Sequence, residues 1–163
     1  VYIIGTMNTA DRSIALIDTA LRRRFSFIEM LPDSSTLADV FVGNLNISRM
    51  LDVLNGRIAV LLDREHTIGH SYLIPLRENP TIENLAEIFE KKIIPLLQVY
   101  FYDDYSKIQL ALGDNQKQED SVRFFVKDNG AAKLFGDADI DVADCYTINS
   151  AAFKNIDAYA RLQ

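Results

Sequence analysis

A polar loop and a block of three arginines, each beside a short apolar run, constrain this chain more than any other feature. The apolar run Val1 to Ile4 leads into a loop at Asn8, and Arg22 to Arg24 precede a second apolar run, Phe25 to Met30. Such runs predict strands at 1–5 and 25–30, with a helix that ends near Ala20 between them. This order is the layout of an α/β nucleotide site, whose functional groups lie at the carboxyl ends of parallel strands.

The middle of the chain predicts a bundle of helices. Apolar residues recur at helical spacing over 34–41, from Asn46 or Ile47 to about Asp63, and from Thr81 to Leu97, and a last helix follows Asp103-Asp104 and ends near Gly113. Pro95 lies inside the third pattern, so we expect a kink there or two helices that meet.

The C-terminal part predicts a smaller unit. Residues 114–120 are polar and predict a loop, while alternation over 121–127 predicts a half-buried strand. A turn at 128–130 and a partner strand at 145–148 complete the hairpin. Ser150 is expected to cap a terminal helix that runs to about Leu162.

Bulk composition excludes several classes of protein. The chain has 163 residues, 48% of them hydrophobic, which is typical of a globular protein. Its net charge of −6, from 17 basic and 23 acidic residues, offers no general attraction to nucleic acid. One cysteine excludes an internal disulfide framework, and no apolar run reaches the roughly 20 residues that span a bilayer, so we expect a cytoplasmic protein without membrane contact.

The arginine block is the strongest candidate for chemistry. Guanidinium groups match phosphate oxygens, and an arginine presented to a neighbouring subunit stabilises charge during phosphoryl transfer. The alternative is that cations favour a helix C-terminus, which explains one or two arginines but not three. Asn8 at a strand tip can polarise a water or contact a phosphate, although an isolated asparagine more often begins a turn.

Two other patterns carry less information. His66 and His70 stand four residues apart, but the residues between them form helix poorly and no zinc motif surrounds them, so we expect no metal site. The chain contains no G-x-x-x-x-G-K-[ST] phosphate loop and no strand that ends in a magnesium-binding Asp-Glu pair. Alone it is therefore not expected to bind or hydrolyse a nucleotide.

The segments Met7 to Ser13 and Ile17 to Phe27 closely resemble the McrB-like AAA+ GTPase subunits of methylcytosine-dependent (type IV) restriction systems. The segments 68–73 and 94–104 resemble further parts of the same family, in the same order. The resemblance covers roughly Val1 to Gly113, and the region around Tyr146 to Tyr159 is similar to the tail of many bacterial relatives.

That resemblance implies a fold and three parts. The fold class is α+β and mainly helical: the last strands of an AAA+ core (1–31), an α-helical lid (32–113) and a small β-hairpin and helix tail (114–163). Val1 begins directly inside a predicted strand, and we therefore expect an excised C-terminal piece of a longer protein.

The resemblance also implies roles for particular residues. Asn8 matches sensor 1, which positions the attacking water, and Arg23 or Arg24 matches the arginine finger, so these three are the expected catalytic residues. Thr9, Asp11 and Arg12 are expected to organise the loop or a subunit interface. His70 and Ser71 lie where many AAA+ proteins carry a sensor 2 arginine, and they either contact nucleotide or begin a helix.

The family implies a GTP- and Mg²⁺-dependent hexameric motor that couples hydrolysis to DNA cleavage by a McrC-like endonuclease. DNA would be recognised by an N-terminal domain that this sequence lacks, and no GTP or Mg²⁺ is expected on the piece itself. Two alternatives remain open: another AAA+ ATPase with a remodelling role, and a non-catalytic helical interaction module.

Overall fold

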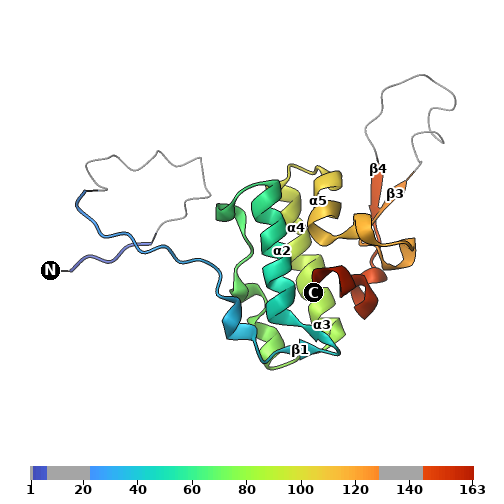
Figure 1. The fold of residues 1–163 in the computed structure, drawn as a ribbon, viewed down its shortest axis with the longest axis horizontal. Helices are drawn as coiled ribbons and strands as arrows, with labels where there is room; N and C mark the ends of the chain where they lie inside the picture. Colours follow the sequence, from blue (N-terminus) through green and yellow to red (C-terminus); the bar gives the residue numbers. More distant parts are fainter. Residues whose placement is uncertain (1, 7–22, 129–144) are drawn as a thin grey trace, which may run out of the picture.

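The computed structural model describes residues 2–6, 23–128 and 145–163 and is organised around one long helix. Helix α2 (Ile47–Leu61) lies against α5 (Tyr105–Leu112), and α3 (Ile82–Ile88) and α4 (Ile94–Tyr100) complete the helical body (Figure 1). The side chain of Asn46 accepts from the backbone N–H of Arg49 and caps α2. The expected helix from Asn46 or Ile47 to about Asp63 is thus confirmed, and the structure adds its cap.

A π-helical turn explains the behaviour of the chain at Pro95. Helices α3 and α4 are joined through Phe89–Ile93, which has π-helical hydrogen bonding. Pro95 has no N–H to donate and its ring crowds the carbonyl four residues earlier, so a regular α-helix cannot pass through this point. The interruption expected from the sequence is confirmed, and the wider turn is the form it takes.

A short hairpin stands where the sequence predicted a helix over 34–41. Ser34–Leu37 form one 3₁₀ turn capped by Asp33, and then strand β1 (Phe41–Val42) pairs antiparallel with β2 (Leu45–Asn46). Gly43, with φ of 59°, occupies the first position of the two-residue turn, which favours glycine. The helix prediction is therefore wrong beyond Leu37, because turn chemistry at Gly43 overrides the apolar spacing.

Helix α4 is followed by a tyrosine in the left-handed backbone conformation. Tyr102 and Asp103 have φ of 51° and 57°, and the Asp103 N–H donates to the carbonyl of Gln98 at 2.9 Å. This is the Schellman arrangement, with tyrosine at the position that glycine usually holds. Asp104 then caps α5, which ends at Gly113 (φ 72°) as predicted.

The tail packs onto the helices rather than apart from them. Strand β3 (Phe125–Asp128) pairs antiparallel with β4 (Cys145–Ile148), which confirms the predicted pairing. The strand predicted from 121 begins only at Phe125, because Asp120–Val122 form a 3₁₀ turn, and Asp128 belongs to the strand rather than to the turn predicted at 128–130, the rest of which lies outside the described residues. Ser150 does not cap a terminal α-helix: the structure has 3₁₀ turns at Ala152–Lys154 and Ile156–Leu162, separated at Asn155. Asn155 interrupts the helix because its side chain accepts from the N–H of Asp157 and starts the second turn.

An aromatic cluster joins tail and helices. The rings of Phe124 and Phe153 stack with centroids 5.0 Å apart, and Tyr159 meets both Phe124 (5.1 Å) and Phe89 of the π-helical turn (5.0 Å) edge-on. All four rings are buried, and they belong to the same apolar core as Leu51, Leu54 and Ile58 of α2.

A buried ion pair lies beneath this cluster. Asp114 and Lys117 are 0% and 5% exposed, and Lys117 Nζ lies 2.6 Å from Asp114 Oδ1 and 3.9 Å from the centre of the Phe124 ring. The Asp114 carboxylate also accepts from the backbone N–H groups of Phe124 and Phe125 at 3.1 and 2.8 Å. The predicted loop at 114–120 is therefore anchored in the core.

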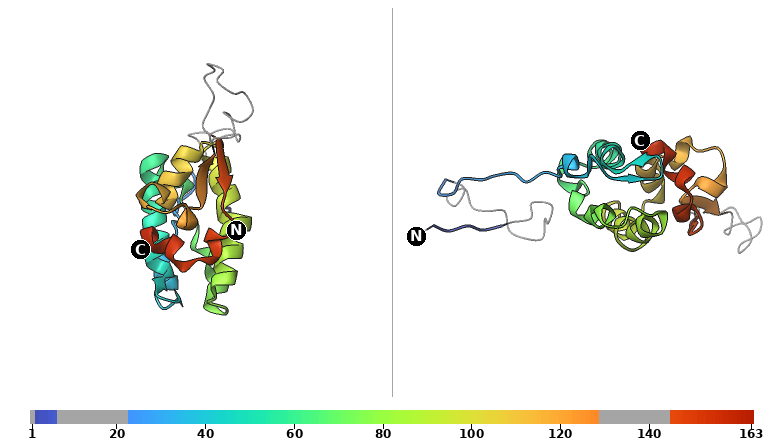
Figure 2. Two further views of the ribbon diagram at one scale, coloured as in Figure 1. Left: turned by 90° about the vertical axis from the view of Figure 1, so that its right-hand side faces the viewer. Right: turned by 90° about the horizontal axis from the view of Figure 1, so that it is seen from below.

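Neither predicted strand is formed over its described residues, 2–5 and 25–30, and the helix predicted between them lies outside the described residues. Residues 2–6 and 26–33 have no regular structure and extend to one side of the helical body (Figures 1 and 2). Their apolar side chains are exposed: Ile4 95%, Ile28 87% and Met30 91%. A strand needs a neighbour for its N–H and C=O groups, and the described part of this chain offers none. That these residues belong to an AAA+ core stays a prediction.

The ion pair yields a first prediction. Asp114→Ala leaves Lys117 charged and buried and orphans two N–H groups, so we expect the free energy of unfolding in urea to fall by about 3–5 kcal/mol. The control is Asp120→Ala, which removes an exposed partner of Arg123 and should cost less than about 1 kcal/mol. Equal losses in the two variants would contradict the anchoring role of Asp114.

Candidate functional site

The predicted catalytic residues fall at the N-terminal end of the chain. Asn8, Thr9, Asp11 and Arg12 lie outside the described residues. Arg23 and Arg24 are described and exposed, and within the described ranges neither has a hydrogen bond or ion pair.

The other two predicted residues lie in a loop that we call the junction loop, residues 63–73. His70 begins a 3₁₀ turn, His70–Tyr72, and Ser71 beside it is exposed. The role of His70 and Ser71, nucleotide contact or the start of a helix, stays a prediction.

Helices α2 and α4 hold the junction loop in place. The Asn55 amide donates to the carbonyl of Ile68 (2.9 Å) and accepts from its N–H (2.6 Å), as a neighbouring strand would. Asp63 accepts from the Glu65 and His66 N–H groups, and from the His66 ring at 2.7 Å, while that ring meets Tyr100 edge-on. The loop is therefore a fixed part of the helical body.

The charge on Asp63 follows from these contacts. Burial alone would raise the pKa of its carboxyl, but the hydrogen bonds from the His66 ring and from two backbone N–H groups outweigh burial and lower the pKa. Asp63 is therefore ionised near neutral pH, and His66 Nδ1 acts as the donor.

Two contacts join the junction loop to the segment that carries the arginines. Arg64 Nη2 lies 2.6 and 2.7 Å from the two carboxylate oxygens of Glu29. Four residues further along that segment, the backbone N–H of Asp33 donates to His70 Nδ1 at 3.0 Å. Residues 29–33 are thus attached to the helical body at both ends.

The contact with Asp33 also orients the ring of His70. Because Nδ1 accepts the Asp33 N–H, the N–H of the imidazole lies on Nε2. His70 therefore differs from His66, whose Nδ1 donates. Within the described residues Nε2 of His70 has no hydrogen-bond partner.

The helical body is similar to parts of known proteins. Residues 46–109 match the family model of the McrB α-helical lid domain. The chain is also similar to the type IV methyl-directed restriction enzyme EcoKMcrB subunit of Escherichia coli (strain K12), at 42% identity over 126 residues. The chain is McrB-like and carries the McrB lid.

Each of the two matches covers only part of a chain. The lid model begins at the α2 cap, Asn46, and ends within α5, so it includes the whole junction loop. The similarity to the Escherichia coli subunit covers 67% of this chain, and the chain spans about a quarter (27%) of that relative's length.

Several residues that join the junction loop to residues 29–33 or hold it in place were not predicted. Arg64 lay in a polar stretch without an assigned role, and Glu29, Asp33 and Asn55 were not singled out. Only their distant partners reveal them, since 35 residues separate Glu29 from Arg64 and 37 separate Asp33 from His70. The one local signal was Asp63, two and three residues before the N–H groups that it caps.

The described part of the chain has no arrangement typical of a metal site or a membrane span. No group of three or more His, Cys, Asp or Glu side chains there is arranged to hold a metal ion. The His66 ring contacts the Asp63 carboxylate, whereas His70 Nδ1 accepts from the backbone N–H of Asp33. None of the described helices has the length and apolar character needed to cross a bilayer.

The His70 contact can be tested by amide exchange in the McrB-like chain. Replacing His70 by Ala removes the acceptor of the Asp33 N–H, so that amide should exchange about two- to tenfold faster by NMR. The Ile68 amide, held by Asn55, should not change, and Ser71→Ala serves as a matched control. Unchanged exchange at Asp33 would show that His70 does not hold it.

Proposed function

We propose that this chain is the C-terminal part of a GTP-hydrolysing AAA+ motor that drives DNA restriction by a partner endonuclease. The observation that carries the proposal is the McrB lid over residues 46–109, together with 42% identity to a type IV restriction subunit. We further infer that the motor is cytoplasmic and forms a hexameric ring, and that a separate N-terminal domain contacts DNA.

Within this motor the chain would supply two different groups to two different nucleotides. Asn8 would position water at the nucleotide of its own subunit, and Arg23 or Arg24 would reach the nucleotide of a neighbour. The exposure of both arginines, without an ion pair among the described residues, fits that second role. Developing charge on the transferred phosphoryl group is what such an arginine stabilises.

GTP and Mg²⁺ are the cofactors we propose for the whole protein. Arg23, Arg24 and the Nε2–H of His70 suit phosphate oxygens, because all three are hydrogen-bond donors. The described residues offer no carboxylate cluster for Mg²⁺, and the sequence has no phosphate loop, so this chain would complete a site that other segments form.

The lid contributes through its attachment to the arginine-bearing segment. Because Glu29 and Asp33 are bound to the junction loop, a rotation of the lid would move residues 29–33 with it. This gives the proposed motor a direct physical connection between lid position and arginine position.

Mixing variant subunits tests the assignment to two different nucleotides. In the whole protein, Arg23→Ala/Arg24→Ala and Asn8→Ala should each lower kcat for GTP hydrolysis, the arginine variant by about 10³-fold or more. A mixture should recover activity, because some interfaces then pair an intact Asn8 with an intact arginine. Arg77→Ala, an exposed arginine of the lid, is the control. A mixture no more active than its components would contradict action in trans.

Nucleotide choice is tested separately by ligand protection against unfolding. GTP with Mg²⁺ at about 100 times its Kd should stabilise the whole protein by about 2.7 kcal/mol, whereas ATP should not. Protection by ATP alone would favour the alternative AAA+ ATPase. Protection by neither nucleotide would favour the helical interaction module.

A further inference from the structure

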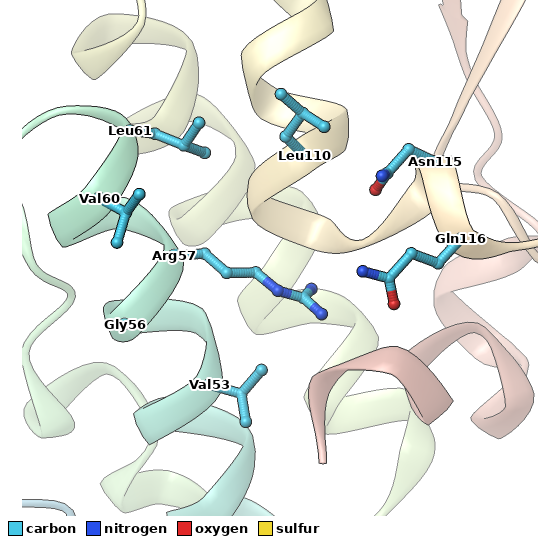
Figure 3. Close-up of a pocket in the computed structure, with 8 residues that line it drawn as sticks. All are labelled: Val53, Gly56, Arg57, Val60, Leu61, Leu110, Asn115 and Gln116. Atoms are coloured by element: carbon cyan, nitrogen blue, oxygen red, sulfur yellow. The ribbon is translucent and has the colours of Figure 1, made fainter.

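A shallow groove runs between α2, α5 and the turn that follows α5, away from the junction loop. Its volume is about 360 Å³, and Gly56, Arg57 and Val60 of α2 face Leu110, Asn115 and Gln116 across it (Figure 3). Figure 3 shows the Arg57 side chain extended from α2 toward Gln116.

The first feature of this groove that suggests a binding surface is Gly56. It lies well inside α2, where glycine weakens a helix relative to alanine. A Cβ built at Gly56 would meet no atom within 4 Å, so packing within the described structure does not require glycine. Glycine does allow another backbone to approach the helix closely.

The groove also exposes apolar side chains and unused amides. Val60 is 86% exposed and Leu110 42%. The side-chain amides of Asn115 and Gln116 are exposed and have no hydrogen bond among the described residues. An apolar floor beside unused donors and acceptors suits a polypeptide, which has both apolar side chains and backbone polar groups.

A fixed positive charge completes the surface. Arg57 is the only charged side chain among the residues that line the groove, and it donates to the carbonyls of Ala111 (3.3 Å) and Arg161 (2.6 Å). It has no ion pair within the described ranges, and the side chain of Arg161 is exposed nearby. Asp114 does not neutralise this charge, because Lys117 already holds it.

We propose that this groove binds a segment of the partner endonuclease in which apolar side chains flank a carboxylate. The apolar side chains would cover Val60 and Leu110, the carboxylate would meet Arg57, and the missing Cβ of Gly56 would admit the backbone. The apolar floor and the chain's net charge of −6 disfavour nucleic acid as the occupant. The identity of the partner rests on the proposed function, whereas the chemistry of the groove does not.

Photo-cross-linking in the purified assembly of the whole protein with its endonuclease tests the proposal. A benzophenone amino acid replaces Val60, and the cross-linked peptide is identified by mass spectrometry. We expect an endonuclease peptide with Asp or Glu beside apolar residues, and none from the same probe at Glu87, an exposed position on α3. No cross-link, or one to DNA, to the same chain or to a second copy, would overturn it.

Filling the groove provides an independent test. Gly56→Leu should lower the Val60 cross-link at least tenfold while leaving the unfolding midpoint unchanged or higher, because leucine favours helix and its Cβ meets nothing. Ala59→Leu, also exposed on α2 but outside the groove, is the matched control. An undiminished cross-link in Gly56→Leu would overturn the proposal. GTPase activity measured on each preparation separates failure of the groove from failure of the proposed function.

Discussion

The buried ion pair of Asp114 and Lys117 is the contact on which the arrangement of lid and tail depends. It follows directly after Gly113 ends α5, and the Asp114 carboxylate holds the N–H groups of Phe124 and Phe125. Both phenylalanines are therefore drawn into the core, although alternation would bury only one of them. The cluster that Phe124 joins reaches Phe89 in the π-helical turn, so tail and lid share one core.

Local chemistry made parts of this fold predictable. Helix α2 followed from apolar spacing, the starts of α3 and α5 from Thr81 and from Asp103-Asp104, and Gly113 marked the end of α5. The helices expected over 34–41 and 150–162 did not form, because Gly43 makes a hairpin turn and Asn155 begins a new 3₁₀ turn. The burial of Asp114 was not predictable from composition, since its reason lies in N–H groups ten and eleven residues away.

The candidate site, too, was predictable only in part. Residue type pointed to Arg23 and Arg24 as candidates and the family resemblance to His70 and Ser71, but the contacts that join their two segments are distant in sequence. Arg64 to Glu29 and Asp33 to His70 are exposed interactions, each of modest energy, and together they fix two points of one short segment. Because they hold the segment that follows the arginines at two points, they restrict its rotation relative to the lid. In the proposed motor this is how nucleotide state in one subunit would reach the arginines offered to the next.

The most direct test of this account is a structure of the whole protein, assembled with Mg²⁺ and a non-hydrolysable GTP analogue. The account predicts that Asn8 faces the nucleotide of its own subunit, and that the Arg23 or Arg24 guanidinium lies about 3 Å from a phosphate oxygen of the neighbour's nucleotide. It also predicts that the Asp33–His70 contact is kept. Arg23 and Arg24 both packed within their own subunit, away from any nucleotide, would contradict it.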